Sequence, residues 1–226
     1  MSDAVKTVPL KGVRGMIADG MVKSLHTAAQ LTHHGSADAT ALLAEKDRLA
    51  GQGVKASVED LLMLATIRAV KANPDANGRV EGREIKLSQA VDLSVAIALP
   101  GNLLVAPAIF RAGEMDVSQL RAARQDLAAR AKTNKLSVTE MTGGTFSISN
   151  LGLTRVEHFT PIINAPQICI LGIGRMVDKL VRGADGGIDL RPHVGLSLTF
   201  DHRALDGAPA GDLLTSICDE IEGMGK

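Results

Sequence analysis

The sequence SLTFDHRALDGAPAGDLL, residues 197–214, joins an apolar run to a helix start through a charged turn. In residues 194–200, valine, leucine and phenylalanine alternate with glycine, serine and threonine, which predicts a strand with one apolar face and one small, polar face. His202 follows this run within two residues. A histidine on such a turn can face a cleft, as a general base must, although an isolated histidine is more often structural.

A second stretch, GGTFSISNLG at residues 143–152, places hydroxyl groups on one face of a predicted strand. That strand ends in the turn-prone sequence Asn-Leu-Gly. On these residues alone, a half-buried strand with a polar face is the simplest interpretation. The chain lacks the G-x-S-x-G sequence of a nucleophile elbow, so Ser147 and Ser149 are poor candidates for a catalytic nucleophile.

The composition favours a single domain over residues 1–226, with residues 1–6 expected to be flexible. A chain of 226 residues with 45% hydrophobic content can bury one sizeable core, and no repeat or linker divides it. Basic and acidic residues balance at 25 each, and aromatic residues make up only 2%. Neither a nucleic acid nor an anionic membrane is therefore expected as a partner.

The two cysteines indicate the compartment. Cys169 and Cys218 lie far apart in apolar surroundings, which predicts two free thiols in a reducing environment. No apolar run approaches the roughly 18 residues that span a bilayer, and the first residues show no targeting pattern. We therefore expect a bacterial-type cytoplasmic protein.

The periodicity predicts a mixed sheet covered by helices. The predicted helices are residues 15–25, a run from an Asp38 cap through Leu49, a run from a Ser57/Asp60 capping box to Asn73, and a run that opens with an Asp116/Gln119 capping box. The predicted strands are residues 91–99, 103–110, 144–149, 167–173 and 194–200, with turns at 100–102 and 184–187. On the last helix, Arg121 and Arg124 are expected to face solvent.

Two further patterns do not support a metal or nucleotide site. His33 and His34 are adjacent, so on a strand they would point to opposite faces, and no third ligand has suitable spacing. Residues 172–174, Gly-Ile-Gly, lack the third glycine of a dinucleotide fingerprint, and no phosphate-binding G-x-x-x-x-G-K-[ST] loop occurs. No metal is expected.

Three blocks, taken together, closely resemble the catalytic domain of the dihydrolipoamide acyltransferases, the acyltransferase (E2) components of 2-oxoacid dehydrogenase complexes. The blocks are GGTFSISNLG at 143–152, FTPIINAPQICILGIG at 159–174 and LSLTFDHRALDGAPAGDLL at 196–214. The resemblance continues upstream through residues 103–137 to VPLKGVRGMIADGM at 8–21. The H-x-x-x-D-G element alone is shared with chloramphenicol acetyltransferases and other coenzyme A-dependent acyltransferases, whereas the three blocks together are specific.

The resemblance implies an α/β fold of the chloramphenicol acetyltransferase type, a mixed sheet covered by helices, assembled as a homotrimer. It also implies an active site between subunits, with His202 of one subunit as general base and the Ser149 hydroxyl of the next stabilising the oxyanion. Asp206 and Gly207 close the histidine motif. For Asp206 a structural role is favoured over a catalytic one.

Two more residues are expected to support this site. Arg14 is the expected partner of Asp206, tying the histidine turn to another part of the fold. Asn164 is expected to pack or form hydrogen bonds nearby. The sequence does not identify the residues that contact coenzyme A.

The implied reaction is acyl transfer between the dihydrolipoyl thiol of a carrier domain and coenzyme A, within a 2-oxoacid dehydrogenase complex. The chain has no lipoyl-lysine motif and no subunit-binding domain, so it is either an excised core or a stand-alone subunit that a separate carrier domain serves. Acetyl, succinyl and branched-chain acyl groups all remain open. The alternatives are a coenzyme A-dependent acetyltransferase for a small hydroxyl or amine acceptor and a non-catalytic trimeric scaffold.

The C-terminus bears on assembly. Relatives that build larger shells usually end in an apolar tail that docks on a neighbouring trimer. After Ile221 this sequence offers Met224 as its one apolar side chain between glycines. Burial of one methionine is worth roughly 1.5–3 kcal/mol, which the ordering of the glycines offsets in large part. An isolated trimer is therefore expected.

Overall fold

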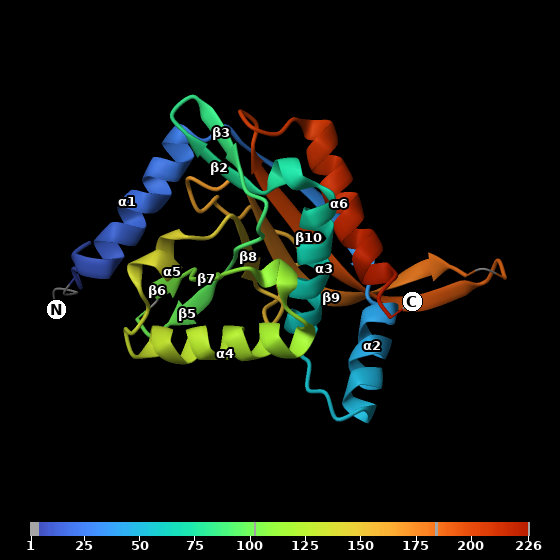
Figure 1. The fold of residues 1–226 in the computed structure, drawn as a ribbon. Helices are drawn as coiled ribbons and strands as arrows, with labels where there is room; N and C mark the ends of the chain where they lie inside the picture. Colours follow the sequence, from blue (N-terminus) through green and yellow to red (C-terminus); the bar gives the residue numbers. More distant parts are fainter. Residues whose placement is uncertain (1–4, 102, 184, 226) are drawn as a thin grey trace.

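The computed structural model describes residues 5–101, 103–183 and 185–225. Its centre is a six-stranded mixed sheet in the order β1-β10-β9-β8-β4-β7 (Figure 1). These strands are β1 (Gln30–Asp38), β4 (Leu93–Val95), β7 (Ala108–Ile109), β8 (Phe146–Asn150), β9 (Cys169–Arg182) and β10 (Ile188–Asp201). β8 runs parallel to both β4 and β9, whereas the other pairs are antiparallel. The mixed sheet predicted from the sequence is confirmed.

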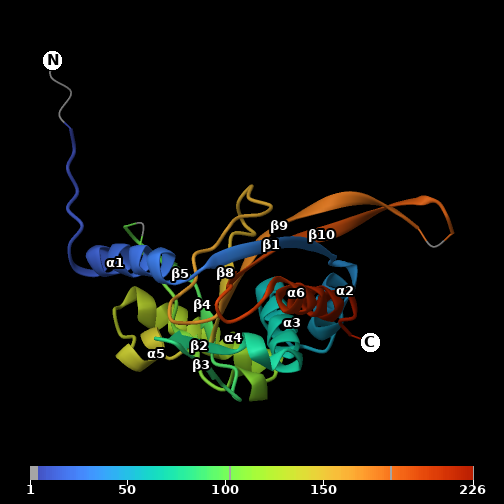
Figure 2. The same cartoon turned by 90° about the horizontal axis from the view of Figure 1, so that it is seen from above.

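One face of this sheet is covered by helices α2 (Thr40–Gly51), α3 (Val58–Ala72) and α6 (Gly207–Glu222), as the view from above shows (Figure 2). The core between these layers holds large apolar side chains with almost no exposed surface. They include Phe146, Phe200, Leu42, Leu61, Met63, Leu93, Ile148, Leu171 and Ile173. The alternating apolar face of residues 194–200 packs into this core, as expected.

The opposite face of the sheet carries the segment 151–166, which crosses over β9 and β10 (Figure 2). The backbone N–H of Phe159 donates to the Ser197 hydroxyl at 3.3 Å. A β-carbon added at Gly195 would come within 2.0 Å of the Glu157 carbonyl oxygen. The small, polar face of β10 is therefore needed because this segment packs directly on it.

Three predicted helices begin close to their expected positions. α1 covers Gly12–Thr27, α3 has the Ser57/Asp60 capping box and ends at Ala72 with Asn73 as its C-cap residue, and α4 (Val117–Lys132) has the Asp116/Gln119 capping box. The cap of α2 differs, because Ala39 is the N-cap residue and Asp38 is the last residue of β1. The Asp38 carboxylate still accepts the Thr40 N–H at 2.8 Å.

The predicted strands need correction at several points. β1 was not predicted from the sequence, and the two runs at 91–99 and 103–110 each break into two strands. The breaks produce the hairpin of β5 (Ile97–Leu99) and β6 (Leu103–Val105), separate from β4 and β7. Pro107 explains one break, since it has no N–H to donate and its carbonyl accepts Val95 N–H at 3.0 Å. Asn102, within the predicted turn 100–102, lies outside the described residues.

β9 and β10 are longer than predicted, at 14 residues each, and their distal halves project from the body as an arm (Figures 1 and 2). The turn predicted at 184–187 joins them, although Ala184 itself lies outside the described residues. The remaining elements are η1 (Pro74–Ala76), β2 (Gly78–Glu81), β3 (Glu84–Leu87), η2 (Ala112–Glu114) and α5 (Val138–Thr142).

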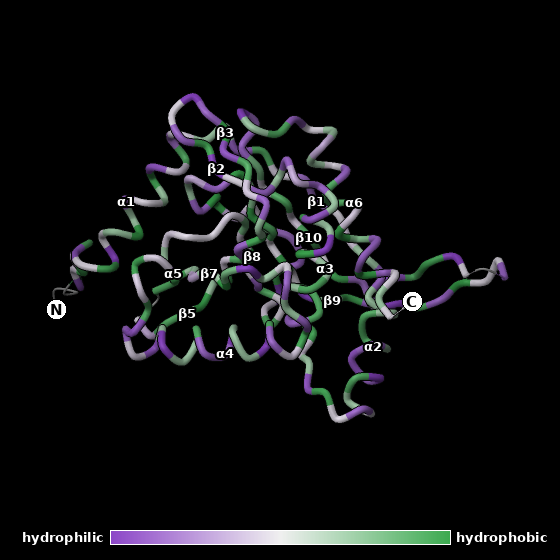
Figure 3. The backbone as a smooth tube through the Cα atoms, in the orientation of Figure 1, coloured by the Kyte–Doolittle hydropathy of each residue, from purple (hydrophilic) through white to green (hydrophobic). Residues whose placement is uncertain are grey.

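The amphipathic pattern of α4 is visible as alternating hydrophobic and hydrophilic residues along its length (Figure 3). Leu120 and Leu127 are buried, as predicted. Arg121 and Arg124 do not face solvent freely, which corrects the expectation from the sequence, because both form ion pairs with buried Asp60 on α3. A buried carboxylate requires such partners.

Residues 1–6 were expected to be flexible, and of these, residues 1–4 lie outside the described part of the chain. Residues 5 and 6 have no regular structure, and Val5 is exposed. No helix among the described residues combines the length and the apolar character needed to cross a membrane.

Candidate active site

His202 lies on the turn between β10, which ends at Asp201, and α6, which begins at Gly207. Its backbone N–H donates to the Ala29 carbonyl at 2.8 Å, and its ring centroid is 5.7 Å from that of Phe200. The side chain is 44% exposed. The backbone of His202 is therefore held in place while its side chain remains partly exposed.

The adjacent Asp201 fixes this turn. Its side chain is almost fully buried and accepts the N–H groups of Ala29 at 3.2 Å and of Arg203 at 3.0 Å. The Arg203 guanidinium adds an ion pair, with Nη2 2.5 Å from Oδ2. Burial acts to raise the pKa of the Asp201 carboxyl, but the Arg203 and Ala29 hydrogen bonds outweigh it and hold that pKa below its usual value. The sequence assigned no role to Asp201. Its position, as a charged residue at the end of a predicted strand, could have indicated that it fixes the turn.

Asp206 is the N-cap residue of α6, and its carboxylate lies 3.4 Å from His202 Nδ1. The Asp206 side chain is 83% exposed, so solvent screens this pair strongly. Arg14 donates to the Gly101 carbonyl at 2.9 Å. Among the described residues of one chain, the expected Arg14–Asp206 pair is not formed. Gly207 opens α6, and a β-carbon there would approach His33 only to 3.9 Å.

Asn164 lies in the segment that connects β8 to β9, where its side chain is half-buried and its carbonyl accepts the Gln167 N–H at 3.1 Å. The preceding Ile163 is bound to the junction of α1 and β1. Its carbonyl accepts the Ser24 hydroxyl at 2.6 Å, and its N–H donates to Gln30 at 3.1 Å. That junction includes Ala29, whose carbonyl accepts the His202 N–H. The Asn164 segment and the His202 turn are therefore both bound to the junction of α1 and β1.

Ser149 lies near the end of β8, between β4 and β9, with a half-buried side chain. Within the described chain its hydroxyl has no hydrogen-bond partner. Ser147, two residues earlier, is fully buried and donates to Gln167 Oε1 at 2.5 Å. Of the two serines, Ser149 therefore has the hydroxyl that is free to meet a substrate.

The strand register separates Ser149 from His202 within one chain. Ser149 pairs with Gly172 on β9, and Gly172 pairs with Ser197 on β10. His202 lies five residues beyond Ser197, which is about 16 Å along the chain, and the two strand spacings add about 10 Å across the sheet. The backbone positions of Ser149 and His202 are thus roughly 20 Å apart, well beyond the reach of one reacting centre.

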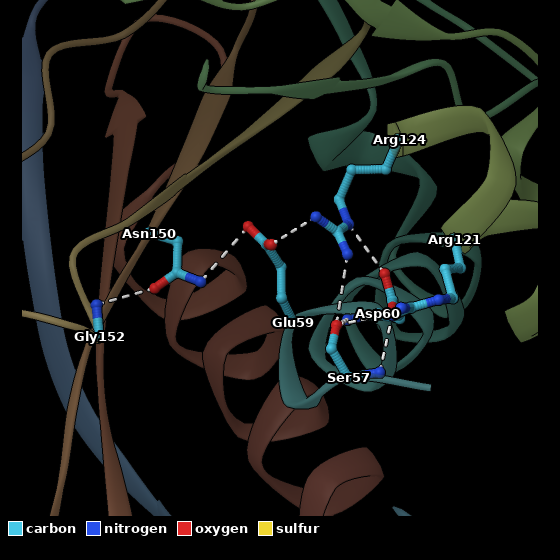
Figure 4. Close-up of polar contacts among 7 residues, drawn as sticks. All are labelled: Ser57, Glu59, Asp60, Arg121, Arg124, Asn150 and Gly152. Carbon is cyan, nitrogen blue, oxygen red and sulfur yellow. Dashed lines mark hydrogen bonds and ion pairs between the residues drawn. The ribbon is translucent and has the colours of Figure 1, made fainter. Parts of the chain in front are cut away.

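A polar network connects the Ser149 turn to α3 and α4 (Figure 4). Asn150 Oδ1 accepts the Gly152 N–H at 2.8 Å, and Asn150 Nδ2 donates to Glu59 Oε1 at 3.4 Å. Glu59 pairs with Arg124 at 3.0 Å, and Arg124 also donates to Asp60 at 2.8 Å. The sequence did not indicate this network, because its members are far apart along the chain.

Asp60 anchors the far end of the network. Burial acts to raise the pKa of its carboxyl, but hydrogen bonds from Arg124, Ser57 and Arg121 keep that pKa below the usual value. The Arg121 nitrogen lies 3.0 Å from Asp60 Oδ2. Asp60 is therefore a buried, ionised group on which two arginines converge.

No group of three potential ligands is arranged for a metal ion anywhere in the described residues. His33 and His34 lie on opposite faces of β1, as strand alternation requires: His33 contacts the Phe200 ring, and His34 shares a hydrogen bond with Ser197.

The two cysteines are free thiols. Burial raises the pKa of Cys169, and raises that of Cys218 to about 11, so neither is an activated nucleophile.

The fold resembles that of chloramphenicol acetyltransferase, with a TM-score of 0.58 over 98% of this chain and 99% of that one. The sequence identity of 14% limits this likeness to the fold. The family model for the catalytic domain of the 2-oxoacid dehydrogenases acyltransferases matches residues 2–226. The chain belongs to this acyltransferase family.

Relatives within the family act in different complexes. The acetyltransferase component of the acetoin cleaving system of Bacillus subtilis is 37% identical over 220 residues, which cover 95% of this chain and 55% of that protein. The succinyltransferase component of the 2-oxoglutarate dehydrogenase complex of Rickettsia bellii is 33% identical, covering 99% of this chain and 57% of that protein. The chain thus spans about half the length of these curated relatives.

Among solved structures, the dihydrolipoamide acetyltransferase of Azotobacter vinelandii superposes with a TM-score of 0.88 at 30% identity. The match covers 98% of this chain and 93% of that one. That structure belongs to a crystallographic and enzymatic investigation of a serine, a histidine and an asparagine in the catalytic mechanism.

Proposed function

We propose that this chain transfers an acyl group between the dihydrolipoyl thiol of a carrier domain and coenzyme A, as part of a 2-oxoacid dehydrogenase complex. The observation that carries the proposal is the accessible imidazole of His202 on a turn that buried Asp201 fixes. A base that reacts with a bulky thiol substrate must be exposed and yet oriented, and this turn combines both properties.

The chemistry requires a base because a free thiol has a pKa near 8.5, so only a few per cent is thiolate at neutral pH. Neutral His202 takes the thiol proton as the sulfur attacks the thioester carbonyl. The carbonyl carbon becomes tetrahedral, and the Ser149 hydroxyl donates to its oxyanion. Collapse breaks the original carbon–sulfur bond, and the departing thiolate recovers the proton from the imidazolium. The same steps run in either direction without an acyl-enzyme.

In this mechanism Ser149 comes from the neighbouring subunit of a homotrimer. The roughly 20 Å separation within one chain supports this arrangement, since one subunit alone leaves the histidine without its oxyanion donor. Exposed apolar side chains on α1 and β1 also support a subunit contact there. They are Val13, Met16, Val22, Leu25 and Leu31.

Asp206 shapes the histidine turn in this proposal and does not transfer protons. In the Azotobacter vinelandii relative, the investigated histidine and asparagine are four residues apart, as His202 and Asp206 are here. An asparagine amide cannot act as a base. Gly207, Asn164 and Arg14 are proposed to support the site structurally, and for Arg14 any link to Asp206 would have to cross between subunits.

The lipoyl group comes from a carrier domain outside these 226 residues, because the sequence contains no lipoyl-lysine motif. The transferred group is acetyl, succinyl or a branched-chain acyl group, and an acyl-coenzyme A panel distinguishes them. The two free thiols support a reducing compartment, which we take to be the bacterial cytoplasm.

Acyl transfer from acetyl-, succinyl- and isobutyryl-coenzyme A to dihydrolipoamide tests the proposal. One donor should give acyl-dihydrolipoamide, and His202→Ala should lower kcat by about 10²–10⁴ with an unchanged oligomer size. Full activity of His202→Ala would overturn the assignment. Transfer to a hydroxyl or amine acceptor alone would favour a small-molecule acetyltransferase. A protein that neither transfers acyl groups nor binds coenzyme A in calorimetry would be a scaffold.

A further inference from the structure

We infer that Glu59 and Arg124 are positioning residues for Ser149: they hold the Asn150 turn and thereby set the place of the Ser149 hydroxyl. The inference rests on the proposed function of Ser149 as oxyanion donor and identifies what that function requires from elsewhere in the same chain. Figure 4 shows the connection, which passes from Gly152 through Asn150 and Glu59 to Arg124.

Ser149 is the last but one residue of β8, so its direction depends on how the strand ends. The strand ends at Asn150, whose side-chain oxygen accepts the Gly152 N–H at 2.8 Å and closes a tight turn. The Leu151 N–H donates to the Ile173 carbonyl at 2.8 Å, which ties the same turn to β9. The backbone of Ser149 is therefore fixed on one side by β9 and on the other by the Asn150 amide.

The Asn150 amide needs a defined orientation for this role. Its oxygen must face Gly152, so its NH₂ group must face an acceptor. Glu59 is that acceptor, at 3.4 Å, and an ionised carboxylate cannot donate, so it excludes the reversed amide. Without Glu59, the amide could turn its NH₂ group toward Gly152 and lose the turn-closing bond.

Glu59 is itself held in place by partly buried polar contacts. Glu59 and Arg124 are 25% and 18% exposed, and their charged atoms are 3.0 Å apart. The Arg124 guanidinium also bonds the buried Asp60 carboxylate at 2.8 Å and the Ser57 hydroxyl at 3.3 Å. Charge-assisted bonds in such a setting are stronger and more directional than those on an open surface. The position of Glu59 at the end of β8 therefore depends on how α3 packs against α4.

The predicted effect follows from the geometry that an oxyanion donor must satisfy. Such a donor acts at 2.7–3.1 Å or so from the developing charge, and a misplacement of about 1 Å can cost about 10²-fold in rate. Glu59→Ala leaves the β9 contact of the turn intact, so we expect a partial effect of about tenfold on kcat. KM for coenzyme A should stay within about twofold, because ground-state binding does not use the oxyanion donor.

A double-mutant cycle separates positioning from general stability. The cycle compares wild type, Glu59→Ala, Ser149→Ala and the double variant in acyl transfer to dihydrolipoamide. If Glu59 acts through Ser149, Glu59→Ala should cause no further loss once Ser149 is replaced. Independent, multiplicative losses would overturn the inference. Glu45→Gln, which removes another arginine-paired carboxylate that is 12% exposed but lies on α2, should leave kcat unchanged.

A rescue variant guards against a folding defect in Glu59→Ala. Asn150→Asp places two carboxylates opposite each other and should also lower kcat about tenfold, and adding Glu59→Gln should restore most of it. The amide and the carboxylate then exchange places while the Gly152 N–H keeps its acceptor. A purely structural role predicts no recovery in the second step, and that result would overturn the inference.

The two proposals fail in different ways. If wild type transfers no acyl group, or Ser149→Ala keeps full kcat, the proposed function of Ser149 falls and the positioning role falls with it. If wild type and Ser149→Ala behave as proposed but Glu59→Ala keeps full kcat with an unchanged melting temperature, the positioning role alone is overturned.

Discussion

The two halves of the site are supported in different ways. The His202 turn is held by its sequence neighbours Asp201 and Arg203 and by Ala29, which lies just before the adjacent strand β1. The Ser149 turn is held by Glu59, which lies 91 positions before Asn150 and on another element. The proposed base thus depends on a short motif, whereas the proposed oxyanion donor depends on how two helices pack.

This difference separates what a motif can specify from what the whole fold must supply. The Asp201 contacts form wherever the end of β10 pairs with the start of β1, because the partners Ala29 and Arg203 lie at these strand ends. The contact between Asn150 and Glu59 forms only when α3 and α4 bring Glu59 and Arg124 to the end of β8. Changes in helix packing should therefore affect the Ser149 half first.

The largest expected effect comes from separating the two halves onto different subunits. His202→Ala and Ser149→Ala homotrimers should each lose about 10²–10³ or more of the wild-type rate. When the two variants are co-expressed with separate tags and purified as hybrids, some sites combine the intact histidine of one subunit with the intact serine of the next. Each purified hybrid trimer contains both variants, so about one of its three sites should be intact, because the contact is directional.

Activity of the purified hybrids measures this recovery directly, and each unmixed variant serves as its own control. A hybrid with no more activity than either parent would show that His202 and Ser149 do not act at a shared site. Recovery of about a third of the wild-type rate would also establish that the subunit contact runs head to tail.

The sequence predicted the elements that carry His202 well and the surroundings of Ser149 only in part, while the catalytic roles of both residues stay proposals. The His202 turn, the strand before it and α6 lie in one continuous stretch, so periodicity and turn residues were sufficient. Ser149 was assigned from the resemblance. Its separation from His202 emerges only from the β8-β9-β10 register, which no local pattern encodes.

The errors in the predicted fold have the same origin. Arg124 was expected in solvent because arginine on the polar face of an amphipathic helix usually lies there. Its partner Asp60 is 64 positions away, and the capping box that correctly predicted the start of α3 gave no sign that the same carboxylate would be buried. β1 was missed because only its pairing with β10 stabilises a stretch with mixed polarity.

The next effect concerns stability, and it comes from the buried carboxylate of Asp60, which belongs to the Ser149 half. Asp60→Asn should lower the free energy of unfolding by about 2 kcal/mol, because Arg121 and Arg124 lose their charged partner. Urea unfolding at fixed protomer concentration measures this change. Asp126→Asn, which removes an exposed partner of Arg130 on α4, is the matched control and should change stability little.

The pH dependence of that stability follows from the lowered pKa values of Asp60 and Asp201. Each carboxylate contributes stability that is fully present above its unfolded pKa, near 3.9, and is lost as the pH falls through its lower folded pKa. The free energy of unfolding of wild type should therefore fall below about pH 4, with a shallower slope in Asp60→Asn and in Asp201→Asn. An unchanged slope in both variants would show that neither carboxyl has a lowered pKa.

The smallest effect is expected at Asp206, whose carboxylate approaches the proposed base His202 and is 83% exposed. Asp206→Asn keeps the shape of the side chain and removes its charge, so it tests whether the 3.4 Å approach to His202 Nδ1 matters to the rate. Because solvent and salt screen an exposed pair, kcat/KM should change by less than about fivefold, and the difference from wild type should shrink as ionic strength rises. Asp201→Asn, at the buried end of the same turn, should reduce kcat/KM more, since it leaves the N–H groups of Ala29 and Arg203 without their ionised acceptor. A hundredfold loss in Asp206→Asn that persists at high salt would instead assign Asp206 to proton transfer. The turn would then orient His202 through its exposed carboxylate, and the buried one would serve stability alone.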